Sequence, residues 1–246
     1  MTTNDQKSAT HQKIAFVTGA SSGIGRAITK RLAADGHHVI AAARRIDLLD
    51  ELAAETDAIE AYALDVTDLE AMRAAVTATV ERHGRLDVFV ANAGVMPLSR
   101  LDAGLVDQWN HMIDVNVRGL LHGIAAVSGP FGEQGSGHFV TIASIGAHGV
   151  TPTAAVYCGT KYAAWAITEG LRLESPPGIR VTTVSPGVVE SELADTITDP
   201  TAQQAMSEYR RHAIPASAIA DAVAFAVSQP PEVDVNEIVV RPASQR

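Results

Sequence analysis

Hydrophobic positions along the chain follow two alternating patterns, which are short runs of β-branched or apolar residues and longer stretches with apolar positions at helical spacing. The short runs predict strands and the longer stretches predict helices. The predicted strands are Ile14–Thr18, His38–Ala42, Ile59–Leu64, Leu86–Ala91, Gly137–Ala143, Ile179–Val184 and Ile238–Val240. The predicted helices are Ile24–Asp35, Asp47–Glu55, Leu69–Arg82, a long helical region over Val106–Val127, and Ala155–Glu174. This alternation predicts an α/β fold with a doubly wound, mostly parallel seven-stranded sheet and helices on both faces.

The connections between these elements are short, and no linker rich in Pro, Gly or Ser divides the chain. We therefore expect a disordered polar tail at residues 1–12, followed by one domain over residues 13–246. The stretch Glu190–Ile214 is polar and weakly patterned. A late segment of this kind predicts a mobile substrate lid near residues 188–214.

Composition and charge narrow the function classes. Hydrophobic residues make up 46% of the 246 residues, which is enough for a sizeable core. The net charge of −9 disfavours nucleic acid as a partner. The single cysteine, Cys158, forms no internal disulfide, and the polar start lacks the apolar core of a signal peptide. No apolar stretch is long enough to predict a membrane span. The single cysteine fits a reducing compartment, so we expect a cytoplasmic protein.

A glycine-rich turn follows the first predicted strand and directly precedes a predicted helix. It reads Thr18-Gly19-Ala20-Ser21-Ser22-Gly23-Ile24-Gly25. Such glycines let a pyrophosphate approach the backbone, and the helix N-terminus offers free N–H groups. The spacing is G-x-x-x-G-x-G and differs from the general dinucleotide fingerprint, so an ordinary tight turn remains the alternative interpretation.

The end of the second predicted strand bears on cofactor choice. A carboxylate at this position would bind the ribose 2′-hydroxyl of NAD. The chain instead reads Ala41-Ala42-Ala43-Arg44-Arg45, and two guanidinium groups suit a 2′-phosphate. This pattern favours NADP(H); two arginines that simply face solvent are the alternative.

A Tyr-x-x-x-Lys pair lies near the start of the helix predicted over Ala155–Glu174. Tyr157 and Lys161 are four residues apart and share one helix face. We expect the ammonium to lower the pKa of the phenol, so that the pair can exchange a proton with an alcohol oxygen. The pair alone is common by chance. Its weight comes from the other motifs expected at the carboxyl edge of the sheet, where ligands gather. These are the glycine-rich turn, Asn92-Ala93-Gly94, Ser144 and Ser185-Pro186-Gly187.

Taken together, these motifs resemble the short, single-domain branch of the short-chain dehydrogenase/reductase family. The resemblance extends from Lys13 to about Pro242 and implies a Rossmann-type catalytic domain. Its matching elements are Thr18–Gly25, Asp65-Val66, Asn92-Ala93-Gly94, Asn116, Ser144, Tyr157-x-x-x-Lys161 and Pro186-Gly187. Two departures, Ala91 for an Asn and Ser191 for the usual Thr, remove no catalytic group.

The resemblance implies a role for each catalytic residue. Tyr157 would act as general acid or base on the substrate oxygen, and Ser144 would hydrogen-bond the same oxygen. Lys161 would tune Tyr157 and hold the nicotinamide ribose, while Asn116 would position a water for proton relay. The residues expected to bind the cofactor are Gly19, Ser21, Ser22, Gly23, Ile24, Gly25, Arg44, Arg45, Asp65, Val66, Asn92, Ala93, Gly94, Tyr157, Lys161, Pro186, Gly187, Val188 and Ser191.

The expected substrate is a small molecule, a ketone or secondary alcohol with a hydrophobic side, handled by a carbonyl reductase or alcohol dehydrogenase. The expected pocket walls are Met96, Ile145, His148, Val150 and Val189. No metal site is expected, because the nine histidines are scattered and none forms a His-x-x-x-His pair. The C-terminal stretch Val235–Pro242 resembles family members that often form tetramers, so we expect a homo-oligomer, either a tetramer or a dimer.

Two other functions remain open at this point. One is the same chemistry run in the oxidative direction, on an alcohol or a hydroxy acid. The other is a catalytically idle, NADP-binding sensor or scaffold, since a fold does not determine a function.

Overall fold

Seven strands form one sheet in the order β3-β2-β1-β4-β5-β6-β7, and every neighbouring pair of strands is parallel. This computed structural model describes residues 12–245, so the tail expected at residues 1–12 lies outside the described residues except for Gln12. The strands are β1 (Ile14–Thr18), β2 (His38–Ala43), β3 (Ile59–Ala63), β4 (Val88–Ala91), β5 (Gly137–Ile142), β6 (Ile179–Pro186) and β7 (Glu237–Val240). The predicted parallel seven-stranded sheet is confirmed.

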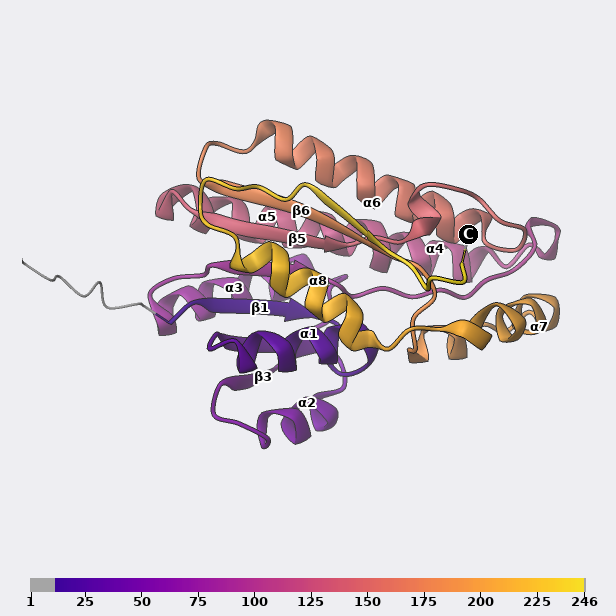
Figure 1. Ribbon diagram of the computed structural model, residues 1–246, viewed down its shortest axis with the longest axis horizontal. Helices are drawn as coiled ribbons and strands as arrows, with labels where there is room; N and C mark the ends of the chain where they lie inside the picture. The colour runs from indigo at the N-terminus through magenta and orange to yellow at the C-terminus, as the bar shows by residue number, and fades with distance from the viewer. Residues whose placement is uncertain (1–11, 246) are drawn as a thin grey trace, which may run out of the picture.

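Helices cover both faces of this sheet, which explains why the inner strands β1, β2, β4, β5 and β6 are buried along most of their length. One face is covered by α1 (Gly23–Ala34), α2 (Ile46–Ala53) and α8 (Ala216–Ser228). The other face is covered by α3 (Leu69–His83), α5 (Gly119–Gln134) and α6 (Ala155–Glu174). Figure 1 shows α1 and α8 side by side in front of the sheet, with α5 and α6 behind it.

The strand order reverses beside β1, because β2 lies on one side of it and β4 on the other. In open parallel sheets such a reversal leaves a crevice at the carboxyl ends of the strands. The glycine-rich turn after β1, Asn92 after β4 and Ser144 after β5 all follow strand ends at this edge. The sheet topology therefore brings motifs from distant parts of the sequence together.

One sequence prediction about helices is wrong, and one helix was missed. The region predicted as one helix over Val106–Val127 is α4 (Val106–Ile113), a π-helical turn η2 (Asp114–Arg118) and α5, which continues past Pro130 to Gln134. The helix α8 was not predicted, because it is apolar nearly all round and lacks an amphipathic stripe. The segment near residues 188–214 contains η4 (Glu192–Thr196), α7 (Pro200–Tyr209) and η5 (Arg210–His212), and its role as a mobile lid stays a prediction.

The remaining regular elements are two short 3₁₀ turns, η1 (Leu101–Ala103) and η3 (Ile145–Ala147). Among residues 12–245, no helix combines the length and the apolar character that crossing a membrane requires.

Three phenylalanines form a ladder across the centre of the sheet. Phe16, Phe89 and Phe139 occupy paired positions on β1, β4 and β5, and their rings stack with centroids 5.4 and 5.3 Å apart. All three side chains are fully buried. The ladder thus fixes the packing of the strands whose ends carry the candidate site.

Truncation of the middle ring should destabilise the whole domain. We expect Phe89→Ala to lower the free energy of unfolding by about 3–5 kcal/mol, because it removes stacking on both sides and leaves a cavity. Urea denaturation measures this. Phe225→Ala is the matched control, since Phe225 is 55% exposed and its truncation should change stability by less than about 0.5 kcal/mol. Equal losses in both variants would contradict this role of the ladder.

Candidate active site

The glycine-rich turn is held against β4 by direct hydrogen bonds. Thr18 Oγ1 accepts from the backbone N–H groups of Asn92 and Ala93, at 3.0 and 3.1 Å, and Asn92 Nδ2 donates to Thr18 O at 2.8 Å. A Cβ at Gly25 would lie 2.2 Å from Gly19 O, so no larger residue fits there. No side chain caps the N-terminus of α1, so its first N–H groups are free to bind an anion.

The end of β2 contributes a polar cluster around Arg45. Its guanidinium donates to Ser21 Oγ at 3.1 Å and to Ser22 Oγ at 2.8 Å, and it forms an ion pair with Glu192 at 2.9 Å. Hydrogen bonds from Arg45 and Ser22 hold the pKa of the Glu192 carboxyl below its usual range. Arg45 therefore already binds one carboxylate at the place where the sequence predicts an anion.

Arg44 and Asp65 lie on the same side of the cavity. Burial raises the pKa of the Asp65 carboxyl, but hydrogen bonds from Thr67 and the charge of Arg44 outweigh burial, so this pKa lies below its ordinary value. Asp65 Oδ1 accepts from Thr67 N at 2.9 Å and from Thr67 Oγ1 at 2.8 Å. The carboxylate is thus ionised and held in a tight turn after β3.

Ser144, Tyr157 and Lys161 meet where β5 ends and α6 begins. Ser144 Oγ accepts from Gly146 N at 3.0 Å and is hydrogen-bonded with Tyr157. Lys161 Nζ lies 5.9 Å from the centre of the Tyr157 ring and donates to Ile142 O at 2.9 Å. Both Tyr157 and Lys161 are buried. The structure therefore brings three of the four predicted catalytic residues into one small region.

The electrostatics of this pair differ from the sequence expectation. Burial raises the pKa of Tyr157 to about 12, against a smaller lowering effect of the Ser144 hydrogen bond. The expected lowering of the pKa by Lys161 is therefore wrong for this state of the site. Burial also lowers the pKa of Lys161, to about 8. Both shifts have one cause, because a poorly solvated site favours the neutral form of each group.

Asn116 lies in the π-helical turn η2 behind this pair. Its amide pairs with both backbone groups of Val95, since Nδ2 donates to Val95 O at 3.0 Å and Oδ1 accepts from Val95 N at 2.8 Å. Nδ2 also donates to Thr160 Oγ1 at 3.1 Å. Asn116 thus ties the loop after β4 to α6, and its relay role stays a prediction.

A cavity of about 1090 Å³ joins these groups along the carboxyl edge of the sheet. Every residue predicted to bind cofactor or substrate lines this cavity, and so does Ser144, whereas Asn116 lines a small space beside it. The cavity can hold a long ligand, because it is lined both by the glycine-rich turn with Arg45 and by Tyr157. A nicotinamide dinucleotide fits these residues: a glycine cradle that a Cβ would fill, free helix N–H groups and an arginine for an anion.

The comparisons with known proteins agree with this geometry. Residues 13–202 match the family model described as short chain dehydrogenase. The chain belongs to this family.

Relatives of this short-chain dehydrogenase cover nearly its full length. An uncharacterized oxidoreductase of Staphylococcus saprophyticus is 43% identical over 238 residues, which span 95% of this chain and 97% of the relative. An alcohol dehydrogenase of the archaeon Thermococcus sibiricus, complexed with 5-hydroxy-NADP, is 29% identical with a TM-score of 0.85 and covers 96% of this chain and 98% of its own. The closed form of a serine dehydrogenase complexed with NADP⁺ is 28% identical with a TM-score of 0.87, covering 95% and 96%.

Sequence reasoning missed part of the cavity wall of this short-chain dehydrogenase. The missed residues come from α7, from the segments next to it and from the chain after β7: Glu192, Leu193, Met206, Tyr209, Arg210, Arg241 and Gln245. No motif marks them, and the segment 188–214 has weak patterning. The predicted lid near residues 188–214 includes five of them without singling any out, and Arg241 and Gln245 have no signal beyond their position after Val240.

Contacts with β6 and β7 hold the side chain of His148. Its Nε2 lies 2.9 Å from Glu237 Oε1 and 3.2 Å from Ser185 Oγ, and its ring meets Trp165 edge-on at 6.5 Å. These contacts orient the imidazole as part of the cavity wall. Its predicted contact with substrate stays a prediction.

The buried ammonium should make stability depend on pH in a definite direction. Below pH 8 Lys161 is charged in both the folded and the unfolded chain, so its burial cost is fully present. Between pH 8 and pH 10.5 the folded chain releases the proton first, so this cost disappears as the pH rises. Relative to Lys161→Met, wild type should therefore gain about 3 kcal/mol over this range.

Urea denaturation of both proteins at several pH values measures this difference. Lys30→Met is the matched control, because the side chain of Lys30 is 51% exposed and its replacement should leave the pH dependence unchanged. Identical pH profiles for wild type and Lys161→Met would show that Lys161 is not desolvated in the folded protein.

Proposed function

We propose that this short-chain dehydrogenase transfers a hydride between NADP(H) and a ketone or secondary alcohol, with Tyr157 as general acid or base. The observation that carries the proposal is the buried Tyr157–Lys161 pair beside Ser144, in one cavity with the glycine-rich turn and Arg45. These groups supply a proton, a hydrogen bond for the substrate oxygen and a binding site for a phosphorylated dinucleotide.

The nicotinamide cofactor supplies the chemistry that the side chains lack, a hydride donated to or accepted from carbon. For reduction, Tyr157 starts as the neutral phenol at neutral pH, since its pKa is about 12. It donates that proton to the substrate oxygen, and Ser144 Oγ–H donates a hydrogen bond to the same oxygen as negative charge develops there.

Lys161 restores the proton on Tyr157. With a pKa of about 8, its ammonium is a stronger acid than an ordinary lysine, and Nζ lies 5.9 Å from the centre of the Tyr157 ring. When Tyr157 becomes a phenolate, Lys161 can return a proton to it and then take one from solvent. In the oxidative direction the same two groups run in reverse, with Tyr157 removing the alcohol proton.

Arg45 supports NADP(H) over NAD(H). Its guanidinium already pairs with the carboxylate of Glu192. A 2′-phosphate carries more negative charge than a carboxylate and suits the same guanidinium. The alcohol dehydrogenase of Thermococcus sibiricus and the serine dehydrogenase named above each carry an NADP-type ligand. Both are similar to this chain over nearly its full length.

A hydroxy acid is the second candidate substrate, and two arginines favour it. Arg210 and Arg241 line the cavity from the segment after α7 and from the chain after β7. Either guanidinium could pair with a substrate carboxylate. The substrate panel therefore includes β-hydroxy acids beside aryl ketones, β-keto esters and aldehydes.

Loss of one hydroxyl should separate catalysis from binding. We expect Tyr157→Phe to lower turnover by at least about 100-fold, since it removes the group proposed to transfer the proton to the substrate oxygen. NADPH affinity should stay within about twofold. Turnover is measured by NADPH oxidation across the substrate panel, and by NADP reduction with alcohols and hydroxy acids.

Tyr162→Phe is the matched control for that experiment, because Tyr162 lies on the same helix but is 41% exposed. It should leave turnover unchanged. Full activity in Tyr157→Phe would contradict the proposed role, and wild-type protein that binds NADPH but turns over nothing in either direction would favour the sensor alternative.

Cofactor selectivity should depend on the arginines at the end of β2. We expect Arg45→Ala to weaken NADPH binding by about 10- to 100-fold, because a charge-assisted contact with the 2′-phosphate is lost, and to change NADH binding little. The double variant with Arg44→Ala should extend this loss. Fluorescence titration measures both affinities, with Arg73→Ala on the exposed face of α3 as control. Equal weakening of NADPH and NADH would overturn the 2′-phosphate assignment.

A further inference from the structure

Two histidines and a glutamate converge at the edge of the sheet opposite the candidate active site. His38 is the first residue of β2, Glu60 lies in β3, and His83 is the last residue of α3. Glu60 Oε2 lies 3.8 Å from His38 Nε2 and 3.5 Å from His83 Nε2, and the three atoms all lie within 4.8 Å of one another. The ligands come from three elements and are more than 20 residues apart in sequence, which is why spacing alone predicts no site.

The two imidazole nitrogens lack the partners that buried polar atoms normally have. His38 Nε2 and His83 Nε2 are inaccessible to solvent, and neither has a hydrogen-bond partner within residues 12–245. Their separations from Glu60 are at or beyond the limit for a hydrogen bond. Buried nitrogens of this kind ask for an explanation, since nearly all such atoms in folded proteins are satisfied.

The two imidazole rings are placed to share one ion, because the Nε2 atom of each lies within 4 Å of Glu60 Oε2. The two rings lie 4.7 Å apart and tilt by 42°, so their nitrogens approach Glu60 from two directions.

Glu60 is held in place by its second oxygen. Glu60 Oε1 pairs with the guanidinium of Arg82, while Oε2 faces the two histidines. Carboxylates that bind metals are usually held by an outer hydrogen-bond partner, and Arg82 is in that position here. The charge of Arg82 opposes a bound cation, and the Glu60 carboxylate lies between the two.

We propose that His38, Glu60 and His83 bind one divalent transition-metal ion, with Zn²⁺ as the best match. Two imidazoles and one carboxylate are an established zinc donor set, with water as fourth ligand. Ligand atoms at zinc bond lengths in a tetrahedral site lie about 3.3 Å apart. The observed separations of 3.5 and 3.8 Å are near this value, so small side-chain movements would close the site around the ion.

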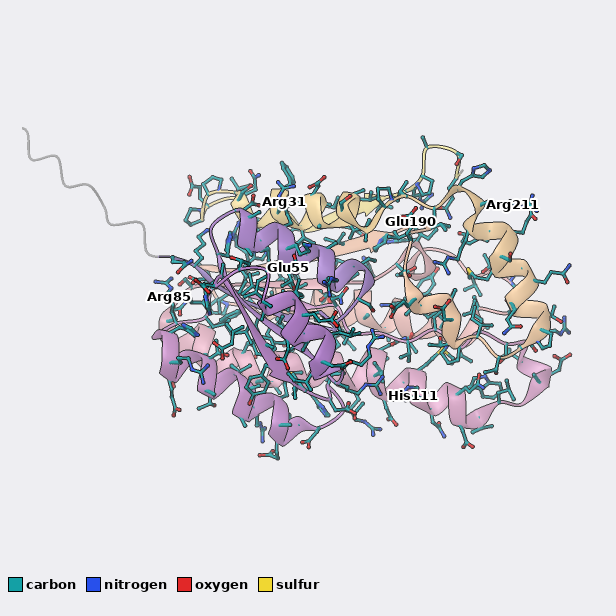
Figure 2. The ribbon with its side chains drawn as sticks, turned by 90° about the horizontal axis from the view of Figure 1, so that it is seen from below. Arg31, Glu55, Arg85, His111, Glu190 and Arg211 are labelled. Atoms are coloured by element: carbon teal, nitrogen blue, oxygen red, sulfur yellow. The ribbon has the colours of Figure 1, made fainter. Side chains whose placement is uncertain are left out.

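This site is separate from the chemistry. It lies at the amino ends of β2 and β3, whereas the active-site cavity lies at the carboxyl ends. Figure 2 shows Arg85, two residues after His83, at the opposite end of the molecule from Glu190 and Arg211. A metal here would join β2, β3 and α3 and stabilise the fold by binding only the native state.

Zinc titration of the tag-free, full-length protein tests the proposal. Isothermal titration calorimetry with ZnCl₂ should show one equivalent bound, and the unfolding midpoint should rise when zinc is added. His83→Gln and His38→Gln should each weaken zinc binding by more than about tenfold, a loss at least as large as removal of an outer-shell partner causes. His111→Gln, at an exposed histidine on α4, is the control and should bind zinc like wild type.

Two outcomes would overturn the proposal. One is no saturable zinc binding by wild type, and the other is equal affinity in wild type and His83→Gln. Should a variant fail to fold, anomalous diffraction from a zinc-soaked wild-type crystal decides the question by the presence or absence of a peak between the three side chains. NADPH turnover should be the same with and without zinc, so failure here leaves the proposed function untouched.

Discussion

Burial of the Lys161 ammonium is the constraint on which the candidate site depends. The side chain reaches from α6 to the carbonyl of Ile142 at the end of β5, so the helix and the strand must pack closely for this bond to form. That packing also desolvates Tyr157 and sets its hydroxyl beside Ser144. Burying an ammonium is unfavourable, and the stability of the sheet must offset this free energy. The stacked rings of Phe16, Phe89 and Phe139 contribute to that stability.

The elements that follow from local hydrophobic patterns could be predicted from the sequence. Alternation of apolar runs with amphipathic stretches is a direct consequence of a covered parallel sheet, so the sheet and most helices could be inferred. The carboxyl edge followed from topology, and with it the meeting of Ser144, Tyr157 and the glycine-rich turn in one cavity. Helix α8 was not predicted, because its sequence is apolar on nearly every side and shows no amphipathic stripe.

Properties that depend on three-dimensional distance could not be predicted in the same way. The sequence places Lys161 next to Tyr157 and suggests a lowered phenol pKa, yet the depth of burial decides the direction and raises it to about 12. The cluster of His38, Glu60 and His83 is equally hidden, because its members come from three elements. Spacing finds ligands on one helix, but it cannot find ligands that only the fold assembles.

Glu192 links cofactor selectivity to the segment over the cavity. Its carboxylate comes from η4 and pairs with Arg45 at the end of β2, where Ser22 is a further partner. Any anion that binds Arg45 must share this guanidinium with Glu192 or displace it. A 2′-phosphate carries more charge than a carboxylate and would repel Glu192, whereas a 2′-hydroxyl would leave the ion pair in place. The position of η4 and the choice between the two nicotinamide cofactors therefore depend on one arginine.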